Sequence, residues 1–130
     1  MQKENPVVWF EIYVDDMERA QKFYETVFGT SLEEMPMPEA AGEGMKMVSF
    51  PMTMEKTNGA PGALVKMQGM KAGGNGTVVY FGSEDSAIEE ARVEAAGGKV
   101  LQSKMNIGEY GFAVMATDTE GNTFGIHSLN

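Results

Sequence analysis

The order of predicted elements along this chain occurs twice. Residues 7–14 are rich in β-branched and aromatic side chains and predict a strand, and residues 17–28 carry apolar residues at helical spacing. Asp15 and Asp16 are both suited to cap the helix start, and Gly29 is suited to end it. Three strand-like segments complete this half: 31–37, 45–52 and 62–68.

The second half repeats this layout. Shifting the first half forward by 69 positions places Trp9 on Val78, Asp16 on Asp85 and Gly29 on Gly98 without a gap. Ser83 or Asp85 is expected to cap the second helix, which we expect to turn Ile88, Ala91 and Ala95 inward. The predicted elements are strand 77–81, helix 86–96 and strands 99–107, 111–118 and 122–129, with a tight turn at 119–121. Such a repeated unit constrains the fold more than any single element does.

The glycine-rich stretch 69–76 joins the two halves. A phosphate-binding loop would require a helix after it, whereas a strand follows here, so a linker is the better interpretation. The chain therefore predicts a single domain over 1–130, with a first module at 1–68, a linker at 69–76 and a second module at 77–130.

Composition excludes several classes of function. The 19 acidic and 10 basic residues give a net charge of −9, which repels nucleic acid and serves either to keep the protein in solution or to attract a cationic ligand. Without cysteine, the chain has no disulfide, thiolate nucleophile or thiolate metal site. No segment is apolar enough to span a membrane and residues 1–6 lack a signal-peptide run, so we expect a cytoplasmic protein without membrane contact. Twelve methionines suit irregular cores and adaptable binding surfaces.

Two motifs carry a resemblance to a known group. Residues 14–24 (VDDMERAQKFY), followed by Phe28-Gly29, look like the "FY…LG" helix of the vicinal oxygen chelate superfamily, and residues 118–122 (DTEGN) look like its "DPDGN" turn. That group includes glyoxalase I, ring-cleaving dioxygenases, fosfomycin-resistance enzymes and bleomycin-binding proteins. The resemblance implies an α+β fold in which two βαβββ modules form an open, U-shaped mixed β-barrel with the helices outside. The site would lie on the concave face.

Strand alternation supports this sidedness independently. In 7–14, one face carries only apolar residues and the other carries Trp9, Glu11 and Tyr13. In the last strand, Phe124 and Ile126 share one face and the opposite side chains share the other. We therefore expect a mixed concave wall that also includes Thr123, Gly125 and His127.

The resemblance also implies a divalent metal held by histidines and glutamates on four strands. When these four positions are carried over to this chain, the first falls on Trp9, the one at the start of the second half on Val78 (Thr77 if the register slips by one) and the last on Gly125. The remaining strand, 62–68, contains neither an acid nor a histidine. A divalent metal needs several converging nitrogen or oxygen donors, so we predict no metal and no other cofactor.

Glu11 and His127 are the candidates for chemistry, although no catalytic role is assigned. Glu11 is either a rim carboxylate, a pocket base or an anchor for a cationic group. His127, the only histidine, is either a structural side chain or a general acid–base partner of Glu11. Of five candidate aromatic wall residues we expect two or three to line a pocket, and Tyr110 to close over its mouth. The aromatic candidates are Trp9, Tyr13, Phe50, Tyr80 and Phe112, and the predicted ligand-binding set is Trp9, Glu11, Tyr13, Tyr80, Thr123 and His127.

Three functions remain open. The favoured one resembles the bleomycin-binding type: a protein that binds a small cationic or planar molecule without a conventional divalent-metal site. The alternative is a divergent lyase, isomerase or other enzyme related to lactoylglutathione lyase, acting through Glu11, His127 and Tyr80. The third is a ligand-free dimeric interaction domain, which an apolar, filled concave face would favour. Under all three we expect a homodimer, because the edges of an open sheet need covering.

Overall fold

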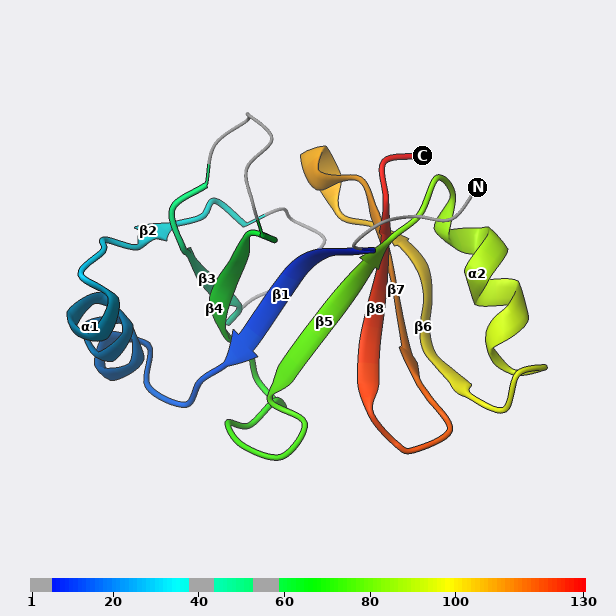
Figure 1. Ribbon diagram of the computed structural model, residues 1–130, viewed down its shortest axis with the longest axis horizontal. Coiled ribbons are helices and arrows are strands. Elements are labelled where there is room, and N and C mark those ends of the chain that lie inside the picture. Colours follow the sequence, from blue (N-terminus) through cyan, green and yellow to red (C-terminus); the bar gives the residue numbers. More distant parts are fainter. Residues whose placement is uncertain (1–5, 38–43, 53–58) are drawn as a thin grey trace.

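A computed structural model describes residues 6–37, 44–52 and 59–130 and contains one eight-stranded mixed sheet. In chain order the elements are β1 (Val7–Tyr13), α1 (Met17–Phe28), β2 (Glu33–Glu34), β3 (Lys46–Ser49), β4 (Gly62–Lys66), β5 (Thr77–Gly82), α2 (Ser86–Val93), β6 (Lys99–Asn106), the 3₁₀ turn Gly108–Tyr110, β7 (Phe112–Thr117) and β8 (Thr123–Ser128). The strand order is β2-β3-β4-β1-β5-β8-β7-β6, and the sheet is open, with β2 and β6 at its edges. Figure 1 shows helices α1 and α2 at opposite ends of the molecule, with β1 and β5 at its centre.

The predicted βαβββ order is confirmed in both halves. The first strand of each half pairs in parallel with the last strand of that half, β1 with β4 and β5 with β8. The two first strands pair antiparallel with each other and join the halves into one sheet. None of the helices in the described part of the chain is long and apolar enough to cross a membrane.

Helix α1 forms where the sequence places it. The Asp16 carboxylate accepts a hydrogen bond from the Arg19 backbone N–H at 3.0 Å, which satisfies one donor of the first turn. Gly29 ends the helix in the left-handed region, at φ 62°, where a side chain would be strained. Asp15, the other capping candidate, accepts instead from the Ala72 backbone N–H at 3.2 Å, within the glycine-rich stretch.

Helix α2 differs from the prediction in its length and its orientation. It ends at Val93, and Ile88, Ala91 and Ala95 are exposed rather than inward. Polar contacts set this orientation, because the Ser86 backbone N–H donates to Ser128 Oγ at 3.1 Å and Glu90 accepts from the Lys104 backbone N–H at 2.8 Å. Of the two predicted caps, Asp85 accepts from the first-turn backbone.

The strands of the first half are shorter than predicted. Only Glu33–Glu34 of the segment 31–37 is a strand, and 45–52 contracts to Lys46–Ser49. Prolines at 36 and 51 lack the N–H that would extend the ladder. The predicted loop at 39–44 and the connection at 53–61 lie mostly outside the described residues.

Two apolar clusters lie on opposite faces of the sheet. The outer cluster packs under α1 and contains Val14, Met17, Leu32, Val48 and Leu64. The inner cluster joins residues of the β2–β3 edge to residues of β7, so the sheet must curl until its two ends face each other. The concave face of this curled sheet is therefore an interior surface, consistent with the U shape expected from the sequence.

The predicted tight turn at 119–121 is organised by Asp118. Its carboxylate accepts from the backbone N–H groups of Glu120 and Asn122, at 2.8 and 2.9 Å, and from the Asn122 side chain. These hydrogen bonds lower the pKa of the Asp118 carboxyl below its usual range. Gly121 adopts φ 83°, which explains the glycine of the motif.

Candidate functional site

Glu11 lies at the centre of the concave face and accepts three side-chain hydrogen bonds. Its Oε1 atom accepts from Tyr13 Oη at 2.8 Å and from Tyr80 Oη at 3.0 Å, and its Oε2 atom accepts from Trp9 Nε1 at 3.1 Å. Only 6% of Glu11 is exposed to solvent. Glu11 is therefore a buried, fully oriented carboxyl group rather than a carboxylate on the rim.

The strand geometry brings these four residues together. Trp9, Glu11 and Tyr13 alternate along β1 and share its concave side. The neighbouring strand β5 pairs Trp9 with Tyr80 and Glu11 with Val78, which places the Tyr80 ring diagonally beside Glu11. We refer to Trp9, Glu11, Tyr13 and Tyr80 as the Glu11 cluster. The sequence predicted their shared wall, but not the convergence of all three donors on one carboxyl group.

The two phenols of the Glu11 cluster are held as neutral donors. Burial raises the pKa of both Tyr13 and Tyr80 far above the usual value, and the neighbouring Glu11 carboxylate raises them further. A tryptophan N–H donates only, so all three partners direct hydrogen toward Glu11. Within the described ranges the single ion pair joins Lys104 and Asp85, so no described cation neutralises Glu11.

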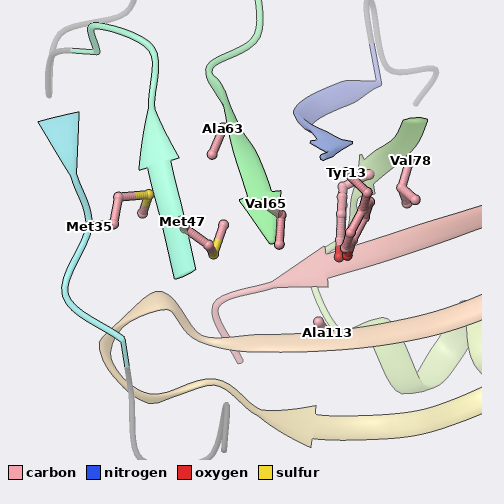
Figure 2. Close-up of a cluster of buried hydrophobic side chains, with 8 residues drawn as sticks. Tyr13, Met35, Met47, Ala63, Val65, Val78 and Ala113 are labelled. Carbon is pink, nitrogen blue, oxygen red and sulfur yellow. The ribbon is translucent and has the colours of Figure 1, made fainter. Parts of the chain in front are cut away.

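Methionines cover much of the remaining concave face. Met35 and Met47 are buried beside Tyr13, Val65 and Val78 in the inner cluster. Figure 2 shows this cluster with Ala63 of β4 and Ala113 of β7 on opposite sides of it. Further partly buried residues pack against it: Met37, Met45, Met70, Met115, Trp9, Ile107 and Tyr110. The sequence left two roles open for the methionines, filling the core and lining a binding surface. These same methionines are placed where they could serve either role.

The strand positions that would carry a divalent metal do not suit one. Trp9 donates to Glu11, and Val78 is fully buried. Gly125 lies under the Tyr80 ring, where an added Cβ would come within 2.3 Å of Tyr80 Cδ2. On β4 the concave side carries Ala63 and Val65. Among the residues that the structure describes, no three His, Asp or Glu side chains are grouped closely enough to hold a metal ion.

His127 shares the concave side of β8 but lies at a different level from Glu11. Its Nε2 atom is 2.6 Å from the Tyr110 carbonyl oxygen, so the ring donates to the turn before β7. Strand β8 pairs His127 with Gly82 of β5. Val78 of β5 pairs with Glu11 of β1, and the β5–β8 register extended by one residue aligns Val78 with Thr123. Four residues of extended strand separate the two levels by roughly 13 Å. The structure therefore brings Thr123 level with Glu11 and places His127 toward the other end of the strand.

The remaining aromatic candidates divide between the faces. Phe50 packs with the outer cluster, where its ring centroid is 5.6 Å from that of Phe10. The Phe112 ring lies under Lys104, with Nζ 4.6 Å from its centroid, and its neighbour Ala113 takes the concave side. Tyr110 packs against the inner cluster, and its hydroxyl group is 3.5 Å from the Pro36 carbonyl oxygen across the mouth of the U.

Comparison with known proteins agrees with this geometry. Residues 7–42 match the family model described as bleomycin resistance protein-like N-terminal. The whole fold superposes on Streptomyces coelicolor methylmalonyl-CoA epimerase bound to 2-nitronate-propionyl-CoA, with a TM-score of 0.64 and 16% identity over 95% of this chain and 96% of that one. The chain therefore has the fold of this epimerase, and its first 42 residues include the match to that family model. The resemblance carried by the helix and turn motifs is thus confirmed.

A further solved structure has the same fold, and a curated protein is related in sequence. Methylmalonyl-CoA epimerase from Mycobacterium tuberculosis aligns over 96% of this chain and 88% of its own, with a TM-score of 0.64 and 12% identity. The candidate glyoxylase CFP32 of Mycobacterium bovis is 27% identical over 94% of this chain. This chain spans 45% of the length of that relative.

Proposed function

We propose that this protein binds a small molecule with a cationic or planar group on its concave face, without a conventional divalent metal. The observation that carries the proposal is the Glu11 cluster: a buried carboxyl group held by three neutral donors and paired with no described cation. Burying a charge without a counter-charge costs stability, so a cluster of this kind suits a site whose partner arrives with the ligand. The net charge of −9 would speed capture of a cation.

Access to Glu11 requires side chains to move. The covering methionines are unbranched and adapt to different shapes, which supports a face that closes when empty and repacks around a ligand. Met37, Met45 and Met70 are only partly buried, and Trp9 is half-buried at the edge of the Glu11 cluster. These residues are the ones we expect a ligand to displace or stack against, with Thr123 and His127 further along the same wall.

Benzamidinium and benzamide form a matched pair of probes for this site. Both are planar and similar in shape, but only the first is a cation that can donate to a carboxylate. We expect benzamidinium to bind at least tenfold more tightly, which corresponds to about 1.4 kcal/mol. Trp9 is the only tryptophan, so its emission reports on the Glu11 cluster directly. Isothermal titration at low and high salt measures the affinities for the two probes. An affinity for benzamidinium that does not depend on salt would count against electrostatic attraction as a source of binding.

The enzyme alternative rests on relatives rather than on the residues of this chain. Two structural neighbours are epimerases of a CoA ester and the curated relative is a candidate glyoxylase. The His127 ring donates a hydrogen bond to the Tyr110 carbonyl oxygen, and the strand register separates His127 from Glu11. A glyoxalase assay with added divalent metals would test this alternative, and measurable turnover would place it ahead of simple binding.

The interaction-domain alternative is favoured by a specific surface. The concave face is covered by side chains, and α1 exposes Phe23, Val27 and Phe28 by 58, 55 and 66%. An apolar surface of this kind on a helix is typical of contact with another chain. We expect a homodimer by size-exclusion chromatography with light scattering, and we expect Phe23→Ser with Val27→Ser to shift it toward the monomer. A parent protein that is monomeric at about 100 µM would contradict the dimer, because a dimer with an ordinary interface is already formed at this concentration.

A further inference from the structure

The Glu11 carboxylate has a limited capacity to accept hydrogen bonds, about two on each oxygen atom. Tyr13 Oη and Tyr80 Oη both donate to Oε1, at 2.8 and 3.0 Å, and so fill the capacity of that atom. Trp9 Nε1 donates to Oε2 at 3.1 Å and takes one further position. No other donor within the described ranges reaches this carboxylate. One acceptor position therefore remains, on Oε2 beside the Trp9 indole.

The two phenols are not readily replaced by a ligand. Tyr13 and Tyr80 are buried, with 6 and 9% of their surface exposed. A ligand that displaced either hydroxyl group from Oε1 would leave a buried donor without that acceptor, which opposes binding. Trp9 is only partly buried, so the open position on Oε2 lies next to the more exposed of the three partners. A ligand is therefore expected to reach Glu11 from the Oε2 side.

Cationic groups differ in how many hydrogen bonds they direct to one carboxylate. A guanidinium or amidinium group presents two parallel N–H donors and binds both oxygen atoms as a fork, whereas an ammonium group directs a single N–H to one oxygen. Because Oε1 has no position left for the second arm of a fork, we propose that Glu11 selects ligands with an alkylammonium group over ligands with a guanidinium or amidinium group. This inference rests on the proposed function and assigns its class of cation. An ammonium group on Oε2 also lies beside the Trp9 ring, and aromatic rings attract such groups.

Benzylammonium and benzamidinium are suitable probes, because each carries one phenyl ring and is a cation at neutral pH. Calorimetric titration of the parent protein is expected to show that benzylammonium binds more tightly, by about threefold or more. Tyr80→Phe keeps the ring but removes the hydroxyl group, which frees a position on Oε1. In this variant the ratio of benzamidinium affinity to benzylammonium affinity should rise by about fivefold or more, because both arms of the fork now find an acceptor. Tyr13→Phe should raise the ratio in the same way.

Tyr24 provides the matched control, because it packs with the outer cluster on the opposite face of the sheet. Tyr24→Phe should leave the affinity ratio within about twofold of the parent value, and circular dichroism melting confirms that the three variants fold. If neither cation binds more tightly than neutral benzamide, the proposed function fails and this inference fails with it. If both cations bind more tightly than benzamide but the parent protein prefers benzamidinium, or the ratio is the same in all three variants, the cation site stands and the selection for ammonium is overturned.

Discussion

Replacing Glu11 by alanine should lower the free energy of unfolding by about 3–5 kcal/mol, because it leaves three buried donors without an acceptor. Trp9 Nε1, Tyr13 Oη and Tyr80 Oη all donate to this one carboxyl group. Urea denaturation followed by circular dichroism measures the change. Replacing exposed Glu34 by alanine provides the control and should alter stability by less than about 0.5 kcal/mol.

A second variant separates the Glu11 cluster from simple packing. Changing Glu11 to leucine together with Tyr13→Phe and Tyr80→Phe removes the carboxyl group and two of its donors at once. Because replacing all polar partners by apolar groups is often close to neutral, this triple variant should recover much of the lost stability. It should not recover binding of a cation. A triple variant as unstable as Glu11→Ala would show that the hydrogen bonds are not what determines stability here.

Replacing Gly125 by alanine is expected to cost about 2–4 kcal/mol, because the new Cβ overlaps the Tyr80 ring. An ideal Cβ would lie 2.3 Å from Cδ2 and 2.4 Å from Cε2 of Tyr80, whose side chain is itself buried. Displacing Tyr80 also withdraws its hydroxyl group from Glu11. The native-state emission of Trp9 should therefore change together with the stability.

Gly62 provides a matched control on the opposite face of the sheet. A Cβ at Gly62 would meet the Phe10 ring at 2.4 Å, so Gly62→Ala carries the same kind of steric overlap. Phe10 packs away from the Glu11 cluster, and this variant should lose stability while its Trp9 emission stays native. If Gly125→Ala is as stable as the parent protein, or if both variants alter Trp9 equally, the described packing of Tyr80 on Gly125 is incorrect.

The sequence predicted the fold well because local and global signals agree. Asp16 and Gly29 mark both ends of α1, and alternation along β1 separates Trp9, Glu11 and Tyr13 from the apolar face. These signals depend only on neighbouring residues. The pairing register places Val78 beside Glu11 and Gly125 beside Tyr80.

The parts that could not be predicted depend on contacts between distant segments. The rotation of α2 follows from Ser128 and Lys104, which lie 42 and 14 residues from their partners on the helix. The burial of Glu11 requires Tyr80 from the other half of the chain. The pairing of Met35 with Met47 depends on a strand of only two residues, which periodicity cannot detect.

The titration that compares benzamidinium with benzamide on Glu11→Gln protein tests the central claim most directly. Glutamine keeps the shape of Glu11, and its carbonyl oxygen can still accept from Tyr13 and Tyr80, but it loses the charge and the acceptor for Trp9 Nε1. If Glu11 is the anchor of a cation site, the preference of at least tenfold that we expect in the parent protein should fall below about twofold in this variant, with Trp9 emission as the readout. An unchanged preference, or equal affinities for the two probes in the parent protein, would contradict it.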